Sequence, residues 1–119
     1  MTEQQARLRD AVREYLVWCF KHESAPRADE LARFVGMSRS AFSRHFKAIC
    51  GGPPGRALKR AQLHYAHELI GAGARTNRAA YQAGYGSRRT LYRSFRRAFG
   101  SSPSAASIPE GAGKSRGIC

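Results

Sequence analysis

The sequence predicts an all-α protein in which two helix-turn-helix units flank one long helix. Apolar residues recur at helical spacing along most of the chain, and no stretch alternates apolar and polar residues as a half-buried strand would. Gly and Pro residues separate the helical stretches. The phrase "SRSAFSRHFKAICGGPP" at residues 38–54 returns as "SRRTLYRSFRRAFGSSP" at residues 87–103, with the same Ser-Arg start and the same Gly-x-x-Pro end. This duplication predicts two units of the same local structure.

In the first half of the chain the pattern predicts three helices, over residues 3–22, 27–35 and 39–50. The first helix gathers its apolar residues on one face. Pro26 separates it from the second, because proline disfavours helical backbone at the residue before it. Gly36 ends the second helix. Ser38 is a good N-cap for the third, since its hydroxyl can accept a hydrogen bond from a free backbone N–H.

The second half of the chain is expected to hold three further helices, over residues 54–70, 78–83 and 88–99. Pro54 suits the first turn of the long helix, where its missing N–H has no partner to lose. Thr76 or Asn77 is the expected N-cap of the short helix, which Gly84 ends. Ser87 is the expected N-cap of the last helix.

Each copy of the repeated phrase is the second helix of a pair. A short helix, a Gly-containing turn and a longer basic helix follow one another in both halves, which is typical of the helix-turn-helix motif. Ala32 and Ala80 occupy matching places in the two short helices, where a small side chain lets the helices of a pair cross closely. Apolar pairs predict the buried faces of the longer helices: Phe42 with Phe46, and Leu91 with Phe95.

The residues away from these buried faces form the candidate site. Arginine can grip a guanine edge or a phosphate with two hydrogen bonds, and serine can reach a base or a phosphate. A helix with such a face suits the major groove of duplex DNA. The candidate DNA-binding residues are Arg39, Ser40, Ser43, Arg44, Lys47, Arg88, Arg89, Tyr92, Arg93 and Arg96.

The charge supports a nucleic-acid partner. The chain has 21 Lys and Arg against 8 Asp and Glu, a formal net charge of +13. Such a charge favours nucleic acid or an anionic membrane surface. The excess lies in residues 27–100, which hold the repeated phrase. No stretch resembles a signal peptide or is long enough to span a bilayer, so we expect no membrane partner and a cytoplasmic, nucleoid-associated protein.

Two other functions compete with sequence-specific DNA binding. A non-specific nucleoid or RNA-binding protein would need only the charge, although two ordered helix-turn-helix units and the lack of an aromatic sheet surface count against it. A metal sensor could use His64 and His67 on one helix with Cys50 before it, but we expect these histidines to face solvent or phosphate. No catalytic triad, carboxylate pair or P-loop pattern is present. We therefore expect no enzyme, no cofactor and no metal.

The stretch "AAYQAGYGSRRTLYRSFRRAFGSSP", residues 79–103, contains a small Ala, a Gly-aromatic pair, a Ser and a helix ending in Phe-basic-x-x-Phe-Gly-x-x-Pro. In this it resembles the DNA-binding domain of the AraC/XylS family of transcription regulators, most of all the short stand-alone MarA/SoxS-type members. "ALKRAQLHYAHELI" at residues 57–70 looks like the linker helix of that family, with Arg60 and Ala66 at family-typical places. Arg60 at this place more often supports structure than reads bases.

The resemblance implies about seven helices, and a monomeric activator that places two recognition helices in successive major-groove segments of double-stranded promoter DNA. It implies RNA polymerase as a further partner. Contact positions of the family carry over to Ser40, Ser43, Arg44, Arg88, Arg89, Tyr92 and Arg93. Because the second recognition helix carries more of these contact residues than the first, we expect it to provide most of the sequence readout. Ala79 and Ala83 replace larger aliphatic residues of the family, which predicts a less well packed second unit.

The chain is expected to divide into an N-terminal helix with the first helix-turn-helix unit, a linker helix, a second unit and a disordered tail: residues 1–52, 53–72, 73–107 and 108–119. A further turn of helix is expected over residues 104–107. The family region begins close to Met1, so we expect either regulation through the abundance of the protein or a fragment of a longer regulator.

Overall fold

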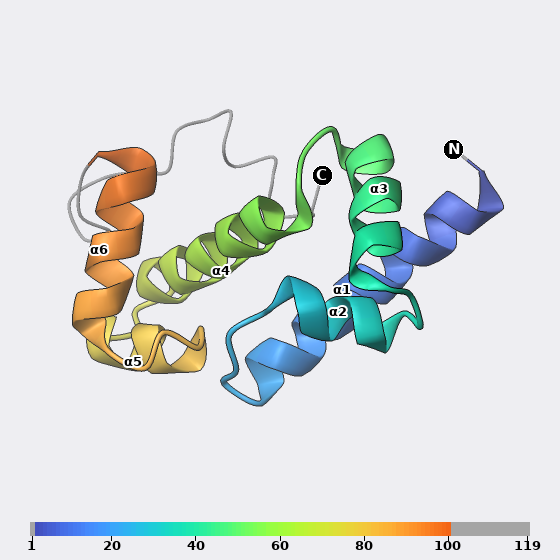
Figure 1. The fold of residues 1–119 in the computed structure, drawn as a ribbon. Helices are drawn as coiled ribbons and strands as arrows, with labels where there is room; N and C mark the ends of the chain where they lie inside the picture. Colours follow the sequence, from blue (N-terminus) through green and yellow to red (C-terminus); the bar gives the residue numbers. More distant parts are fainter. Residues whose placement is uncertain (1, 101–119) are drawn as a thin grey trace.

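A computed structural model describes residues 2–100 of the protein. It contains six α-helices in this range: α1 (Glu3–Lys21), α2 (Ala28–Phe34), α3 (Arg39–Cys50), α4 (Pro54–Gly71), α5 (Thr76–Gln82) and α6 (Arg88–Phe99) (Figure 1). No strand occurs among these residues, so the all-α class is confirmed. The further helical turn at 104–107 and the tail at 108–119 lie outside the described residues.

The two copies of the repeated phrase, α3 and α6, are built in the same way, and each is 12 residues long. Ser38 and Ser87 are their N-caps, and each hydroxyl accepts a hydrogen bond of 3.2 Å from the backbone N–H three residues later. Each helix ends at a left-handed glycine, Gly51 with φ 80° and Gly100 with φ 79°, a conformation that costs glycine little. The same phrase therefore gives the same start, length and end in both places.

The first hydrophobic core joins α1, α2, α3 and the first half of α4. Its buried residues are Leu8, Val12, Tyr15, Leu16, Cys19, Ala28, Leu31, Ala32, Phe42, Phe46, Leu58 and Ala61. The Tyr15 hydroxyl donates to Glu30 Oε1 at 2.7 Å and accepts from the Arg27 N–H at 3.0 Å. Burial and the hydrogen bond to Glu30 raise the pKa of Tyr15. The hydroxyl therefore stays protonated and holds α1 against the start of α2.

The second hydrophobic core joins the other half of α4 to α5 and α6. Its buried residues are Leu63, Ala66, Ala80, Ala83, Leu91 and Phe95. Half of these are alanines, so this core buries less side-chain volume than the first. Gln62, itself buried, donates a hydrogen bond of 2.9 Å from Nε2 to the Ala83 carbonyl oxygen. This bond fixes α4 to the end of α5.

The short helix α5 begins earlier than the sequence predicted. It starts at Thr76, and Arg75 occupies the N-cap position without a side-chain hydrogen bond to the helix. The expectation that Thr76 or Asn77 would be the N-cap was therefore wrong. Arg75 has extended backbone, and the adjoining helix is held by burial of Ala79 and Ala80 instead of by a cap.

The turn between α5 and α6 lies against the loop between α1 and α2. A Cβ atom placed on Gly84 would come within 2.5 Å of the Ala25 nitrogen and 2.6 Å of the Ser24 carbonyl carbon. Gly84 also has a φ of +86°, which only glycine adopts at low cost. The two halves of the molecule thus meet backbone to backbone at a position that requires glycine.

We expect Gly84→Ala to lower the free energy of unfolding more than Gly86→Ala does. Both positions have left-handed backbone, which costs a residue with a Cβ about 1–2 kcal/mol. Only Gly84 has neighbouring atoms within 4 Å of the added carbon, and such overpacking adds about 1–3 kcal/mol. Urea unfolding followed by circular dichroism measures both variants. Equal losses in the two would contradict the close approach at Ala25.

Candidate nucleic-acid interface

The face of α3 opposite the first core exposes polar and basic side chains. Phe42 and Phe46 are buried, which fixes the rotation of the helix about its axis. Arg39, Ser40, Arg44 and Lys47 are exposed, and Ser43 is half-buried. The structure therefore brings the five candidate residues of this helix to its outer side, with Ser43 at the margin.

The outer face of α6 is more basic. Leu91 and Phe95 have no exposed surface and anchor the inner side of the helix. The exposed candidates are the four arginines Arg88, Arg89, Arg93 and Arg96. Tyr92 is half-buried, and the guanidinium carbon of Arg88 lies 6.0 Å from the centre of its ring. This distance permits a cation–π contact between the two side chains.

Neither α3 nor α6 contains an Asp or Glu residue. Among residues 2–100, ion pairs with carboxylates occur away from these two helices, as between Arg7 and Glu3 on α1 at 2.8 Å and between Arg27 and Asp29 at 3.2 Å. The positive charges of α3 and α6 are therefore not neutralised within their own helices. A polyanion is the partner that such faces attract.

Figure 1 shows α3 and α6 at opposite ends of α4, both upright in that view. The linker helix α4 has 18 residues and so spans about 27 Å. Because one end of α4 is packed into the first core and the other end into the second, the spacing of the two outer helices is set by a single rigid element.

A cleft between α4 and α6 holds basic residues that sequence reasoning did not place in the site. Arg56, Lys59 and Arg60 of α4 line it from one side and Arg97 of α6 lines it from the other. The spacing of the three α4 residues, at i, i+3 and i+4, is a basic stripe that the sequence does show. Their meeting with Arg97 depends on tertiary packing, which the sequence pattern does not show.

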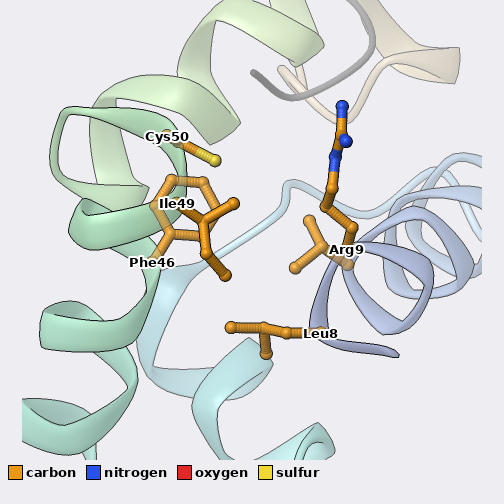
Figure 2. Close-up of a pocket in the computed structure, with 6 residues that line it drawn as sticks. Leu8, Arg9, Phe46, Ile49 and Cys50 are labelled. Atoms are coloured by element: carbon orange, nitrogen blue, oxygen red, sulfur yellow. The ribbon is translucent and has the colours of Figure 1, made fainter. Parts of the chain in front are cut away.

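A smaller hollow between α1 and α3 belongs to the first core. Leu8, Arg9 and Val12 of α1 face Phe46, Ile49 and Cys50 of α3 across it. The Arg9 side chain extends away from Phe46 and Ile49 (Figure 2). The space is too small to admit a water molecule, so it is not a ligand site.

The two histidines of α4 take part in the second unit. His64 is buried, with its ring 6.3 Å from that of Phe99, and His67 is half-buried and stacks on Phe95 at 5.6 Å. The expectation that both would face solvent or phosphate was wrong for His64, because aromatic packing accepts an imidazole ring as it accepts an apolar one. Within residues 2–100 no three His, Cys, Asp or Glu side chains are grouped so as to hold a metal ion.

In the same part of the chain, no helix combines the length and apolar character that crossing a membrane requires.

Comparison with known proteins agrees with this architecture. A family model described as a helix-turn-helix domain matches residues 31–107. The crystal structure of the DNA-binding domain of AdpA, a global transcriptional factor, in complex with a target DNA is similar with a TM-score of 0.65 and 29% identity, over 78% of this chain and 86% of that one. No protein of curated function matches the sequence significantly. With two matched helix pairs on one linker helix, the chain belongs to the AraC-type helix-turn-helix family of DNA-binding transcription regulators.

Proposed function

We propose that the protein binds double-stranded promoter DNA sequence-specifically, with α3 and α6 in successive segments of the major groove. The observation that supports this most is the pair of equivalent helix faces, basic and free of carboxylates, on either side of one linker helix. The similar AdpA domain was crystallised with a target DNA, which supports duplex DNA as the partner here. The proposed role is binding, not catalysis, and it places the protein in the cytoplasm with the nucleoid.

The length of α4 suits a monomer. Successive turns of the major groove on one side of a duplex are about 34 Å apart, and α4 spans about 27 Å before the width of the flanking units is added. One chain can then present two recognition helices to one face of the duplex. No second copy is needed, so the binding site need not be palindromic.

We further propose that the protein activates transcription by contacting RNA polymerase from its promoter site, as the resemblance to AraC/XylS regulators implies. Transcription in vitro from a promoter that contains a bound site tests this role. Transcript yield should rise with protein concentration in the presence of RNA polymerase. A fall in yield would assign the protein as a repressor.

We expect one chain to occupy about two helical turns of duplex. Sedimentation velocity of the complex on a selected site gives the number of chains, and footprinting gives the length protected. A complex with two chains per site would contradict the monomer.

We expect the affinity for duplex DNA to fall steeply with salt. If six to ten of the basic residues contact phosphates, the slope of log K against log salt is about −5 to −9. Fluorescence anisotropy at several salt concentrations measures it. A slope shallower than about −3 would mean that the charge is mostly a solvated surface.

We expect Arg93→Ala or Arg89→Ala to change which bases the protein prefers. We expect Arg44→Ala to lower the affinity for DNA of all sequences more evenly. A lost two-bond contact to guanine costs about 1–3 kcal/mol at one or two base pairs, whereas a lost phosphate contact makes the salt slope shallower by about one. Selection from a random DNA pool, followed by binding assays, separates the two results.

Two controls accompany these variants. Arg7→Ala removes the same charge from α1, where Arg7 is engaged with Glu3, and so measures the effect of net charge alone. Phe95→Ala removes a fully buried ring and should unfold the second unit, since such truncations cost about 3–5 kcal/mol. If Arg44→Ala relaxes specificity and the α6 variants do not, the assignment of readout to α6 is wrong.

A further inference from the structure

The cleft between α4 and α6 has the size of a small-molecule site. Its volume is about 550 Å³, within the range of about 300–1,000 Å³ that is usual for ligand pockets. One wall is the first half of α4, the other is α6, and Ala25 with the α5–α6 turn closes one edge. The hollow between α1 and α3 offers no comparable space.

The charges at the cleft favour an anion. Four cationic side chains line it, Arg56, Lys59, Arg60 and Arg97, and none of the described lining residues is Asp or Glu. Cations gathered around a concave surface raise the local concentration of anions. The hydroxyl of Ser94, which is half-buried and also lines the cleft, adds a hydrogen-bond donor.

The cleft also has an apolar part that a phosphate would not use. Leu63, Tyr85, Ala25 and Ala98 line it beside the cations. Burial raises the pKa of Tyr85, so its hydroxyl stays protonated and able to donate. Apolar surface beside convergent cations suits a ligand that has an apolar body and one anionic group.

The walls of the cleft are held in place without a ligand. The Gln62–Ala83 hydrogen bond of 2.9 Å fixes α4 to α5 at the back. At the edge, the backbone of Gly84 lies against that of Ala25 so closely that a Cβ atom would not fit. A preformed site loses little conformational entropy when it is filled.

We propose that this cleft binds a small aromatic or alicyclic carboxylic acid, with the carboxylate between the cations of α4 and Arg97 and the ring against Tyr85 and Ala98. The ligand weakens DNA binding, a coupling that rests on the proposed function of α6. Thr90 and Arg97 line the cleft and lie on the same helix as Arg93 and Arg96. A carboxylate in the cleft therefore neutralises charge beside the proposed DNA-contact face.

The first experiment titrates the protein alone with 1-naphthoate by isothermal calorimetry at constant ionic strength. The neutral 1-naphthamide has nearly the same shape, and inorganic phosphate supplies the charge without the ring. We expect saturable binding of 1-naphthoate at one site, and binding of both comparison compounds weaker by about tenfold or more. No saturation, equal binding of 1-naphthamide, or equal binding of phosphate would each overturn the proposal, the last by showing a simple phosphate-binding surface.

Variants locate the site. Lys59→Ala and Ala98→Phe should weaken 1-naphthoate binding by about tenfold or more, the first by removing a cation and the second by filling the cleft. Arg78→Ala is the matched control, because Arg78 is exposed on α5 and does not line the cleft. Circular dichroism confirms folding, and Ser94→Leu replaces Ala98→Phe if that variant does not fold. Equal effects of Lys59→Ala and Arg78→Ala would overturn the assignment.

The second experiment measures the coupling to DNA. Saturating 1-naphthoate should weaken the affinity for DNA, and DNA should weaken the affinity for 1-naphthoate by the same factor, because linkage is reciprocal. A factor of one would overturn the coupling. Since the first titration contains no DNA, failure of the cleft to bind 1-naphthoate is distinguishable from failure of the protein to bind DNA.

Discussion

The structure depends on α4 being shared by two separate cores. Leu58 and Ala61 are buried in the first core, and Leu63 and Ala66 in the second. A continuous helix transmits orientation from one core to the other, since its hydrogen bonds leave little freedom to bend. The stacking of Phe20 on Tyr65, with ring centres 4.2 Å apart, adds a contact from α1 to the second half of α4. A break in α4 would leave two small units without a fixed spacing.

The basic faces oppose the stability of this arrangement. A net charge of +13 on 119 residues repels itself in the folded state and less so in the expanded chain. The second unit has only a small apolar core against this repulsion, and half of that core is alanine. Ala79 and Ala83 are completely buried but small, so α5 is held by close helix packing and by the hydrogen bond from Gln62 to Ala83. The unit with more arginine on its surface therefore has the smaller apolar core. Binding a polyanion would relieve the repulsion, so folding and DNA binding support each other.

The sequence predicted α3 and α6 to the residue because local chemistry decides their ends: a serine hydroxyl at one end and a left-handed glycine at the other. It misplaced the start of α5 because that end has no side-chain cap. It missed the burial of His64, since a polar residue type says nothing about an aromatic neighbour such as Phe99. It named the outer faces of α3 and α6 but not the cleft, whose lining runs from Ala25 to Ala98 and comes together only on folding. The roles of the outer faces of α3 and α6 in contacting DNA stay predictions.

The helices α3 and α6 have the same length and the same capping residues but expose different side chains. Positions that hold Ser40, Ser43 and Arg44 on α3 correspond to Arg89, Tyr92 and Arg93 on α6. Short hydroxyl side chains permit close approach to the duplex, whereas arginine reaches farther and pairs with guanine through two bonds. We infer that two unlike faces held in fixed order along α4 read an asymmetric sequence. An asymmetric site would give the bound protein one direction on the promoter, and the contact with RNA polymerase proposed above requires such a direction.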